Sequence, residues 1–112
     1  MINTAAEKNF ENKVKKYIES KGGYQLKYWA GSQFTKAGIP DLLCCINGYF
    51  VAIELKAQNG RPSELQLYQI EKIRKSGGLA FVLYPSAWNK FTTFIEGLYK
   101  DSFSKEMPII LK

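Results

Sequence analysis

Apolar residues recur in three separate segments of the chain, at helical spacing in the first and the third. Each segment therefore predicts an amphipathic helix that buries one face. We expect the first helix from about Thr4 to Lys21, where Thr4 and Glu7 form a capping box. We expect the second to follow Ser63 and to end at Gly77-Gly78, and the third over roughly Ala87–Tyr99. The apolar contacts are Phe10, Val14, Tyr17 and Ile18, then Leu65, Tyr68, Ile70 and Ile73, then Phe91, Phe94, Ile95 and Leu98.

Short apolar runs between these helices predict the strands of a sheet. Asn47-Gly48 is a strong signal for a two-residue hairpin turn. The resulting order, α-β-β-β-α-β-α, predicts an α/β fold with a mixed central sheet flanked by helices. At 112 residues, we expect one domain spanning 1–112. The expected strands are Tyr24–Ala30, Asp41–Ile46, Tyr49–Lys56 and Leu79–Tyr84, while Met107–Leu111 is either an edge strand or a loosely packed tail.

Composition narrows the classes of partner. Basic residues number 16 against 10 acidic ones, for a net charge of +6, which favours nucleic acid over other partners. A basic protein without such a partner is about equally compatible with this count. No apolar stretch is long enough to span a bilayer, and Met1–Phe10 lacks the apolar core of a signal peptide. We therefore expect a cytoplasmic protein that is not exported.

Two residue types limit the chemistry. Histidine is absent, which excludes Ser-His-Asp and Cys-His catalysis and zinc sites that use histidine. Cys44 and Cys45 are adjacent on a strand and point to opposite faces, so they do not pair readily with each other. We expect both to be buried structural thiols. Catalysis would have to come from carboxylates, lysine, tyrosine, serine or a carboxylate-bound metal.

Two acidic residues are expected to meet across the predicted hairpin. If Asn47 and Gly48 form the centre of the turn, Asp41 lies opposite Glu54, and Lys56 follows on the same face as Glu54. Two like charges in such a place repel, and a divalent cation resolves the conflict. Oxygen ligands alone favour Mg²⁺, with Mn²⁺ as a substitute. The alternative is a buried Glu54–Lys56 ion pair with Asp41 as a turn residue.

These residues resemble the PD-(D/E)XK nuclease motif. The longer set of motif residues between Gly38 and Gly78 resembles VRR-Nuc domains. These domains include small stand-alone phage and bacterial members and are related to archaeal-type Holliday-junction resolvases. The resemblance runs from the first helix to Tyr84, and it implies a restriction-endonuclease-like α-β-β-β-α-β core. The matching residues are Gly38-Ile39-Pro40-Asp41-Leu42-Leu43, Ile53-Glu54-Leu55-Lys56, Gly60, Gln66 and Gly77-Gly78.

The resemblance also implies roles for individual residues. Asp41, Glu54 and the backbone carbonyl of Leu55 would bind the metal. Lys56 would hold the attacking water or stabilise charge on the phosphate, and Gln66 would support the site from the second helix. The implied activity is Mg²⁺-dependent hydrolysis of DNA phosphodiester bonds that leaves a 5′ phosphate.

The resemblance further implies a glutamate on the first helix as a metal ligand. Helix geometry slightly prefers Glu7, and family spacing prefers Glu11. We choose Glu11 and keep Glu7 as the fallback. The capping box already gives Glu7 a structural role.

The candidate DNA contacts are Lys27, Lys36 and Arg61. Lys27 lies in an alternating Lys-Tyr-Trp segment ending at Trp29, and we favour a core role for this segment over a DNA-facing one. A domain this small covers little DNA, so we expect a homodimer that cleaves branched DNA, with four-way junctions as the leading substrate. The alternatives are a nicking or flap nuclease, a non-catalytic DNA-binding module of the same fold, and a small α/β scaffold or inhibitor protein.

Overall fold

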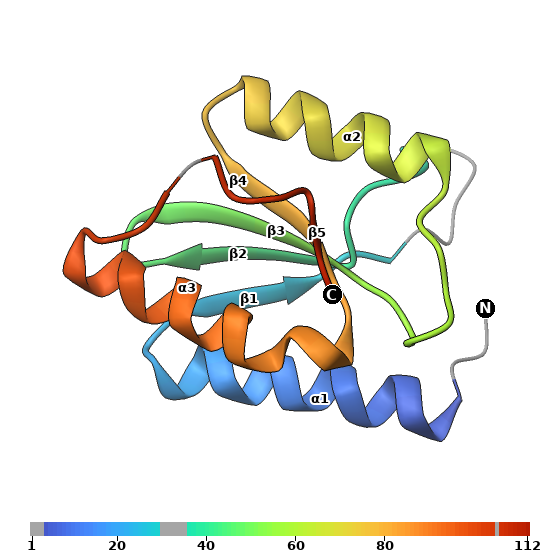
Figure 1. Cartoon of the computed structure of the whole chain (residues 1–112), viewed down its shortest axis with the longest axis horizontal. Helices are drawn as coiled ribbons and strands as arrows, with labels where there is room; N and C mark the ends of the chain where they lie inside the picture. Colours follow the sequence, from blue (N-terminus) through green and yellow to red (C-terminus); the bar gives the residue numbers. More distant parts are fainter. Residues whose placement is uncertain (1–3, 30–35, 105) are drawn as a thin grey trace.

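The computed structural model describes residues 4–29, 36–104 and 106–112. Three α-helices and a five-stranded sheet make up this part of the chain, in the predicted order (Figure 1). Part of the predicted loop between the first two strands, and Ala30, lie outside the described residues. The elements are α1 (Ala5–Ser20), β1 (Tyr24–Lys27), β2 (Leu42–Ile46), β3 (Tyr49–Leu55), α2 (Glu64–Lys75), β4 (Leu79–Leu83), the 3₁₀ turn η1 (Pro85–Ala87), α3 (Trp88–Lys100) and β5 (Ile110–Leu111).

The sheet is mixed, as predicted, and its strands are arranged in chain order. β1, β2 and β3 pair antiparallel, whereas β3–β4 and β4–β5 pair parallel. Between β3 and β4 the chain crosses over through α2. The C-terminal segment resolves the open alternative, because Ile110 and Leu111 form an edge strand beside β4.

The β2–β3 hairpin has the predicted turn and register. Asn47 and Gly48 both have positive φ, at 50° and 85°, which suits a type I′ turn. Ile46 pairs with Tyr49, and the ladder continues to Leu42 and Ile53. The next position therefore places Asp41 beside Glu54.

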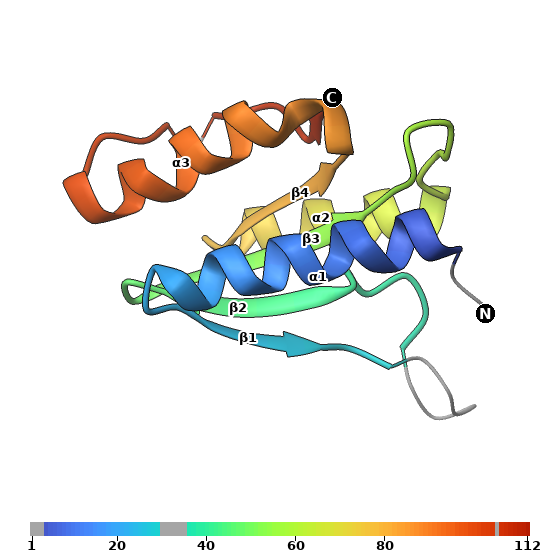
Figure 2. The same ribbon diagram turned by 90° about the horizontal axis from the view of Figure 1, so that it is seen from below.

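Helices cover both faces of the sheet (Figures 1 and 2). α1 and α3 pack on one face, where Val14, Ile18 and Phe91 join the main core. α2 packs on the other face around Ile70. Along β3 the alternation is as predicted: Ile53 faces α1 and α3, while Ala52 faces α2.

The predicted buried faces of α1 and α3 are confirmed, but that of α2 is partly wrong. Leu65 and Tyr68 are exposed, and Leu67, Ile70 and Ile73 make the contact with the sheet. Leu67, Ile70 and Ile73 follow one another at three-residue spacing and form one stripe, whereas Leu65 and Tyr68 lie on the opposite side of the helix. Among the described residues, no helix combines the length and apolar character needed to cross a membrane.

Side-chain caps begin two of the helices. Thr4 and Glu7 form the predicted capping box of α1, and Ser63 and Gln66 form an equivalent box on α2. Both cysteines are free thiols, and Cys44 is buried as expected. The expectation is wrong for Cys45, which is exposed because it points to the opposite face of β2.

Candidate active site

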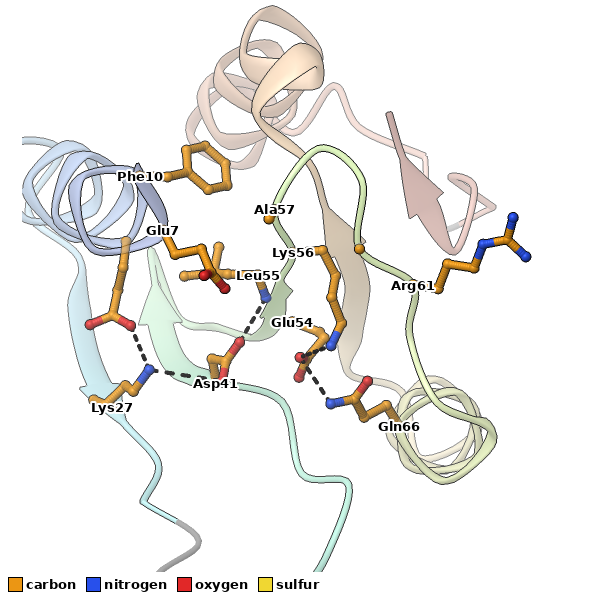
Figure 3. A pocket seen from close by; sticks show the side chains of 12 residues that line it. Glu7, Phe10, Lys27, Asp41, Glu54, Leu55, Lys56, Ala57, Arg61 and Gln66 are labelled. Atoms are coloured by element: carbon orange, nitrogen blue, oxygen red, sulfur yellow. Dashed lines mark hydrogen bonds and ion pairs between the residues drawn. The ribbon is translucent and has the colours of Figure 1, made fainter. Parts of the chain in front are cut away.

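A polar cavity of about 250 Å³ lies at one end of the sheet. Here β1 and β3 end, β2 begins, and the first turns of α1 and α2 come close (Figure 3). All six predicted catalytic and metal-binding residues share this cavity, and it is also lined by two of the predicted DNA contacts. The lining comprises Glu7, Phe10, Glu11, Lys27, Asp41, Glu54, Leu55, Lys56, Ala57, Gly60, Arg61 and Gln66.

The loop before β2 holds Asp41 at the cavity. Gly38 has φ of +80°, and a Cβ at this position would lie 2.7 Å from the backbone oxygen of Leu65. Only glycine lets the loop pass this close to the start of α2. Pro40 is buried, and the carboxylate of Asp41 accepts a hydrogen bond of 2.9 Å from the backbone N–H of Leu55. Asp41 is thereby held against the end of β3.

Glu54 is the most deeply buried acid of the cavity, only 2% exposed. Burial, together with the charge of Asp41, raises the pKa of Glu54 to about 7, although Lys56 acts in the opposite direction. Within the described part of the chain, its Oε1 is buried and has no hydrogen-bond partner. An unpartnered buried carboxylate oxygen is costly, which makes it a strong place for a cation to bind.

Two side chains hold the other oxygen of Glu54. The ammonium of Lys56 lies 3.2 Å from Oε2, and the side-chain amide of Gln66 donates to the same oxygen at 3.1 Å (Figure 3). Gln66 also accepts a hydrogen bond from the backbone N–H of Ser63 at 2.9 Å, so its rotamer is held at both ends. The Glu54–Lys56 ion pair of the alternative interpretation is thus present. It involves Oε2, so Oε1 is still without a hydrogen-bond partner among the described residues.

Glu11 is buried at the side of the cavity, and both its oxygens are engaged. Lys15 lies 2.9 Å from Oε2, and Lys27 pairs with Oε1. Burial alone would raise the pKa of Glu11, but these two lysines outweigh it and the pKa is lowered. The same Lys27 ammonium lies 3.8 Å from Oδ1 of Asp41.

Glu7 takes part in both the helix cap and the cavity. Its Oε1 accepts a hydrogen bond from the backbone N–H of Thr4 at 3.1 Å, and this bond lowers its pKa. Its side chain also turns into the cavity, on the side of Leu55 and Lys56 (Figure 3). The choice between Glu7 and Glu11 as a metal ligand stays a prediction.

The donors at the cavity suit a hard divalent cation. Asp41 and Oε1 of Glu54 supply carboxylate oxygens, and Leu55, at the end of β3, supplies a backbone carbonyl oxygen. Within the described ranges, no group of three or more acidic, cysteine or histidine side chains could hold a metal ion. Mg²⁺ commonly uses one or two carboxylates and completes its shell with water and substrate phosphate. The residues therefore fit such an ion.

The predicted DNA contacts differ in how they are placed. Lys36 is exposed, and Arg61 lines the rim with its side chain directed away from the carboxylates (Figure 3). Lys27 is only 16% exposed and is engaged by Glu11 and Asp41. The preference for a core role of its segment is wrong at Trp29, which is 71% exposed.

Sequence reasoning missed the part that Lys27 plays in the cavity. Lys27 pairs with Leu42 across β1 and β2, and Leu42 lies in the core beneath α1. Lys27 consequently faces α1 and meets Glu11. Since the turn between β1 and β2 is long, their register had no local signal, and this contact could not be derived from spacing.

An α/β sandwich with Asp41, Glu54 and Lys56 at the end of a β-hairpin is the arrangement of PD-(D/E)XK-type nucleases. The family model of the archaeal Holliday junction resolvase (Hjc) matches residues 3–92. The chain belongs to this family, and is in general terms a DNA nuclease.

Solved structures support the same assignment. A "VRR_NUC domain" structure is 28% identical with a TM-score of 0.66, covering 83% of this chain and 97% of its own. A "VRR_NUC domain protein" is 22% identical with a TM-score of 0.69, covering 92% of this chain and 98% of its own, and this likeness concerns the fold. No curated protein matches the chain. The expected VRR-Nuc resemblance and fold class are confirmed.

Proposed function

We propose that this chain is a Mg²⁺-dependent endonuclease that hydrolyses phosphodiester bonds in branched DNA. The observation that carries the proposal is the buried Oε1 of Glu54 beside Asp41, an oxygen that has no hydrogen-bond partner among the described residues. A protein that used this cavity only for structure would gain by filling that position with a donor. A carboxylate left open at a cavity, next to a second carboxylate, is suited to binding a cation.

Asp41, Glu54 and the backbone carbonyl of Leu55 are the proposed metal ligands. A divalent cation bound there would polarise the scissile phosphate and lower the pKa of a water molecule. Leu55 N–H fixes the rotamer of Asp41, and Gln66 fixes that of Glu54. Both carboxylates are thus oriented before any substrate arrives.

Lys56 is the proposed catalytic cation of the protein itself. Its ammonium lies at the cavity beside Glu54 and is 19% exposed, so it is accessible to a phosphate oxygen. A preorganised positive charge stabilises negative charge that develops in the transition state more than charge in the ground state. Lys56 would also orient the attacking water, as the family resemblance implies.

The substrate is proposed from the charge of the protein and from the family match. Arg61 at the rim and the exposed Lys36 would contact phosphates, and the net charge of +6 would supply affinity that does not depend on sequence. Symmetric cleavage of a four-way junction needs two active sites, which a homodimer would provide. The matching family, the archaeal Holliday junction resolvases, supports the same substrate.

A cleavage panel tests this proposal. Four-way junctions, flaps, splayed arms, single strands and plain duplex are compared at equal concentration with Mg²⁺ and with EDTA. We expect cleavage only with Mg²⁺, and fastest at the junction. Faster cleavage of flaps would favour the flap-nuclease alternative, and binding without cleavage of any substrate would favour a non-catalytic DNA-binding module.

A further inference from the structure

A lysine, rather than an open space, separates the helical carboxylate from the rest of the site. The Lys27 ammonium pairs with Oε1 of Glu11 and lies 3.8 Å from Oδ1 of Asp41. The remaining oxygen of Glu11 pairs with Lys15 at 2.9 Å. A metal ion shared by Glu11 and Asp41 would therefore have to displace a lysine that is already in place.

Displacing Lys27 would be costly. Its side chain is only 16% exposed and Glu11 only 5%, so the pair is largely shielded from water and weakly screened. Lys27 is the last residue of β1, so its backbone is held in the sheet beside these carboxylates. Two-metal nucleases hold their ions roughly 4 Å apart, which would require a second set of free carboxylate oxygens.

On the side of Asp41 that faces Glu54, a carboxylate oxygen is available to a cation. Oε1 of Glu54 is buried without a partner among the described residues, and Lys56 and Gln66 both contact only Oε2. One position for a divalent cation is thus open between Asp41 and Glu54, while the position between Asp41 and Glu11 is filled.

We propose that Lys27 takes the place of a second metal ion, so that the site binds one divalent cation, between Asp41 and Glu54. This inference rests on the proposed function, since it concerns the same metal site. Glu11 is then a positioning residue that holds Lys27 beside Asp41, and it is not a metal ligand. The lysine supplies a permanent positive charge where a second ion would otherwise be needed.

Counting bound Mn²⁺ tests the inference without any measurement of cleavage. Mn²⁺ bound per chain is measured by equilibrium dialysis, with the loss of the free-ion electron paramagnetic resonance signal as an independent count. We expect one ion for the wild type and two for Lys27→Met, in which Glu11 and Asp41 are left without their shared cation. Lys15→Met is the matched control, because it removes a lysine from Glu11 but none from Asp41, and we expect one ion.

Melting temperatures give a second readout. Lys27→Met should lose stability in EDTA and regain it in Mn²⁺, by more than Lys15→Met does. Two ions in the wild type, one ion in a folded Lys27→Met, or a Lys27→Met chain that stays unfolded in Mn²⁺ would each overturn the inference. A wild type that binds no Mn²⁺ would instead overturn the metal dependence of the proposed function.

Discussion

Replacing Glu54 with Gln should stabilise the metal-free protein at alkaline pH while abolishing cleavage. The carboxyl of Glu54 has a pKa of about 7 in the folded protein, against an ordinary value of 4.5. Below pH 4.5 the group is protonated in both states and carries no penalty. As the pH rises towards 7 the unfolded chain ionises first, so the free energy of unfolding falls, and above 7 the penalty is complete.

The size of this effect follows from the pKa. At about 1.4 kcal/mol for each pH unit, the penalty is roughly 3 kcal/mol. Glutamine is neutral at every pH, and its side-chain carbonyl can still accept from Gln66, so the penalty disappears in Glu54→Gln. Lys56 loses its carboxylate partner, which makes 3 kcal/mol an upper bound. For a domain of this size the gain corresponds to a rise in Tm on the order of 10 °C.

Thermal unfolding followed by circular dichroism measures the effect in EDTA at pH 4.5 and pH 8.5. We expect similar Tm values at the lower pH and a higher Tm for Glu54→Gln at the higher pH. Mg²⁺ at 100 times its Kd should stabilise the wild type by about 2.7 kcal/mol and leave the variant unchanged.

Glu71→Gln is the matched control, because it makes the same chemical change at an exposed position of α2. Its Tm should follow that of the wild type at both pH values. The reasoning is refuted if Glu54→Gln is less stable than the wild type at pH 8.5, or if the difference in Tm does not grow with pH.

Three further predictions concern the remaining charges. Lys56→Ala should lower kcat by about 10²- to 10³-fold and leave the Kd values for DNA and Mg²⁺ nearly unchanged. Single-turnover kinetics measure the first effect and binding titrations the second, and loss of folding would instead favour a structural ion pair. Glu11→Gln should lower the cleavage rate by about 10- to 100-fold, because Glu11 holds Lys27. Glu7→Gln should mainly lower Tm, because it weakens the capping box. The reverse pattern, with cleavage and Tm measured for both variants, would exchange the two roles. DNA affinity should fall steeply in a log–log salt titration, because basic side chains that contact phosphates release counterions. It should depend little on sequence, because few arginines are present to make bidentate base contacts, and a flat slope with strong sequence preference would contradict this.

Local patterns were enough to predict the elements and the centre of the site. Apolar periodicity located the helices, and the turn at Asn47-Gly48 set the register that brings Asp41 beside Glu54. Both signals are local, so they do not depend on how distant elements pack. The β-hairpin therefore carries most of the site on its own.

Contacts between distant elements could not be predicted in the same way. Leu65 and Tyr68 form one apolar pair at helical spacing, and Leu67, Ile70 and Ile73 form another group on the opposite side of α2. Only the second group packs against the sheet. The pairing of Lys27 with Glu11 depends on how β1 and α1 meet, which spacing does not encode. Tertiary packing decides both cases.

The most direct test of the central claim is cleavage of a four-way junction across a Mg²⁺ titration, for the wild type and for Asp41→Asn. Asparagine keeps an oxygen that can accept from Leu55 N–H, so the fold should persist and the junction should still bind. We predict that wild-type cleavage is absent in EDTA and rises to saturation with Mg²⁺, while Asp41→Asn binds the junction but does not cut it at any Mg²⁺ concentration. Cleavage in EDTA, or cutting by Asp41→Asn at the wild-type rate, would contradict a metal-dependent site at Asp41 and Glu54.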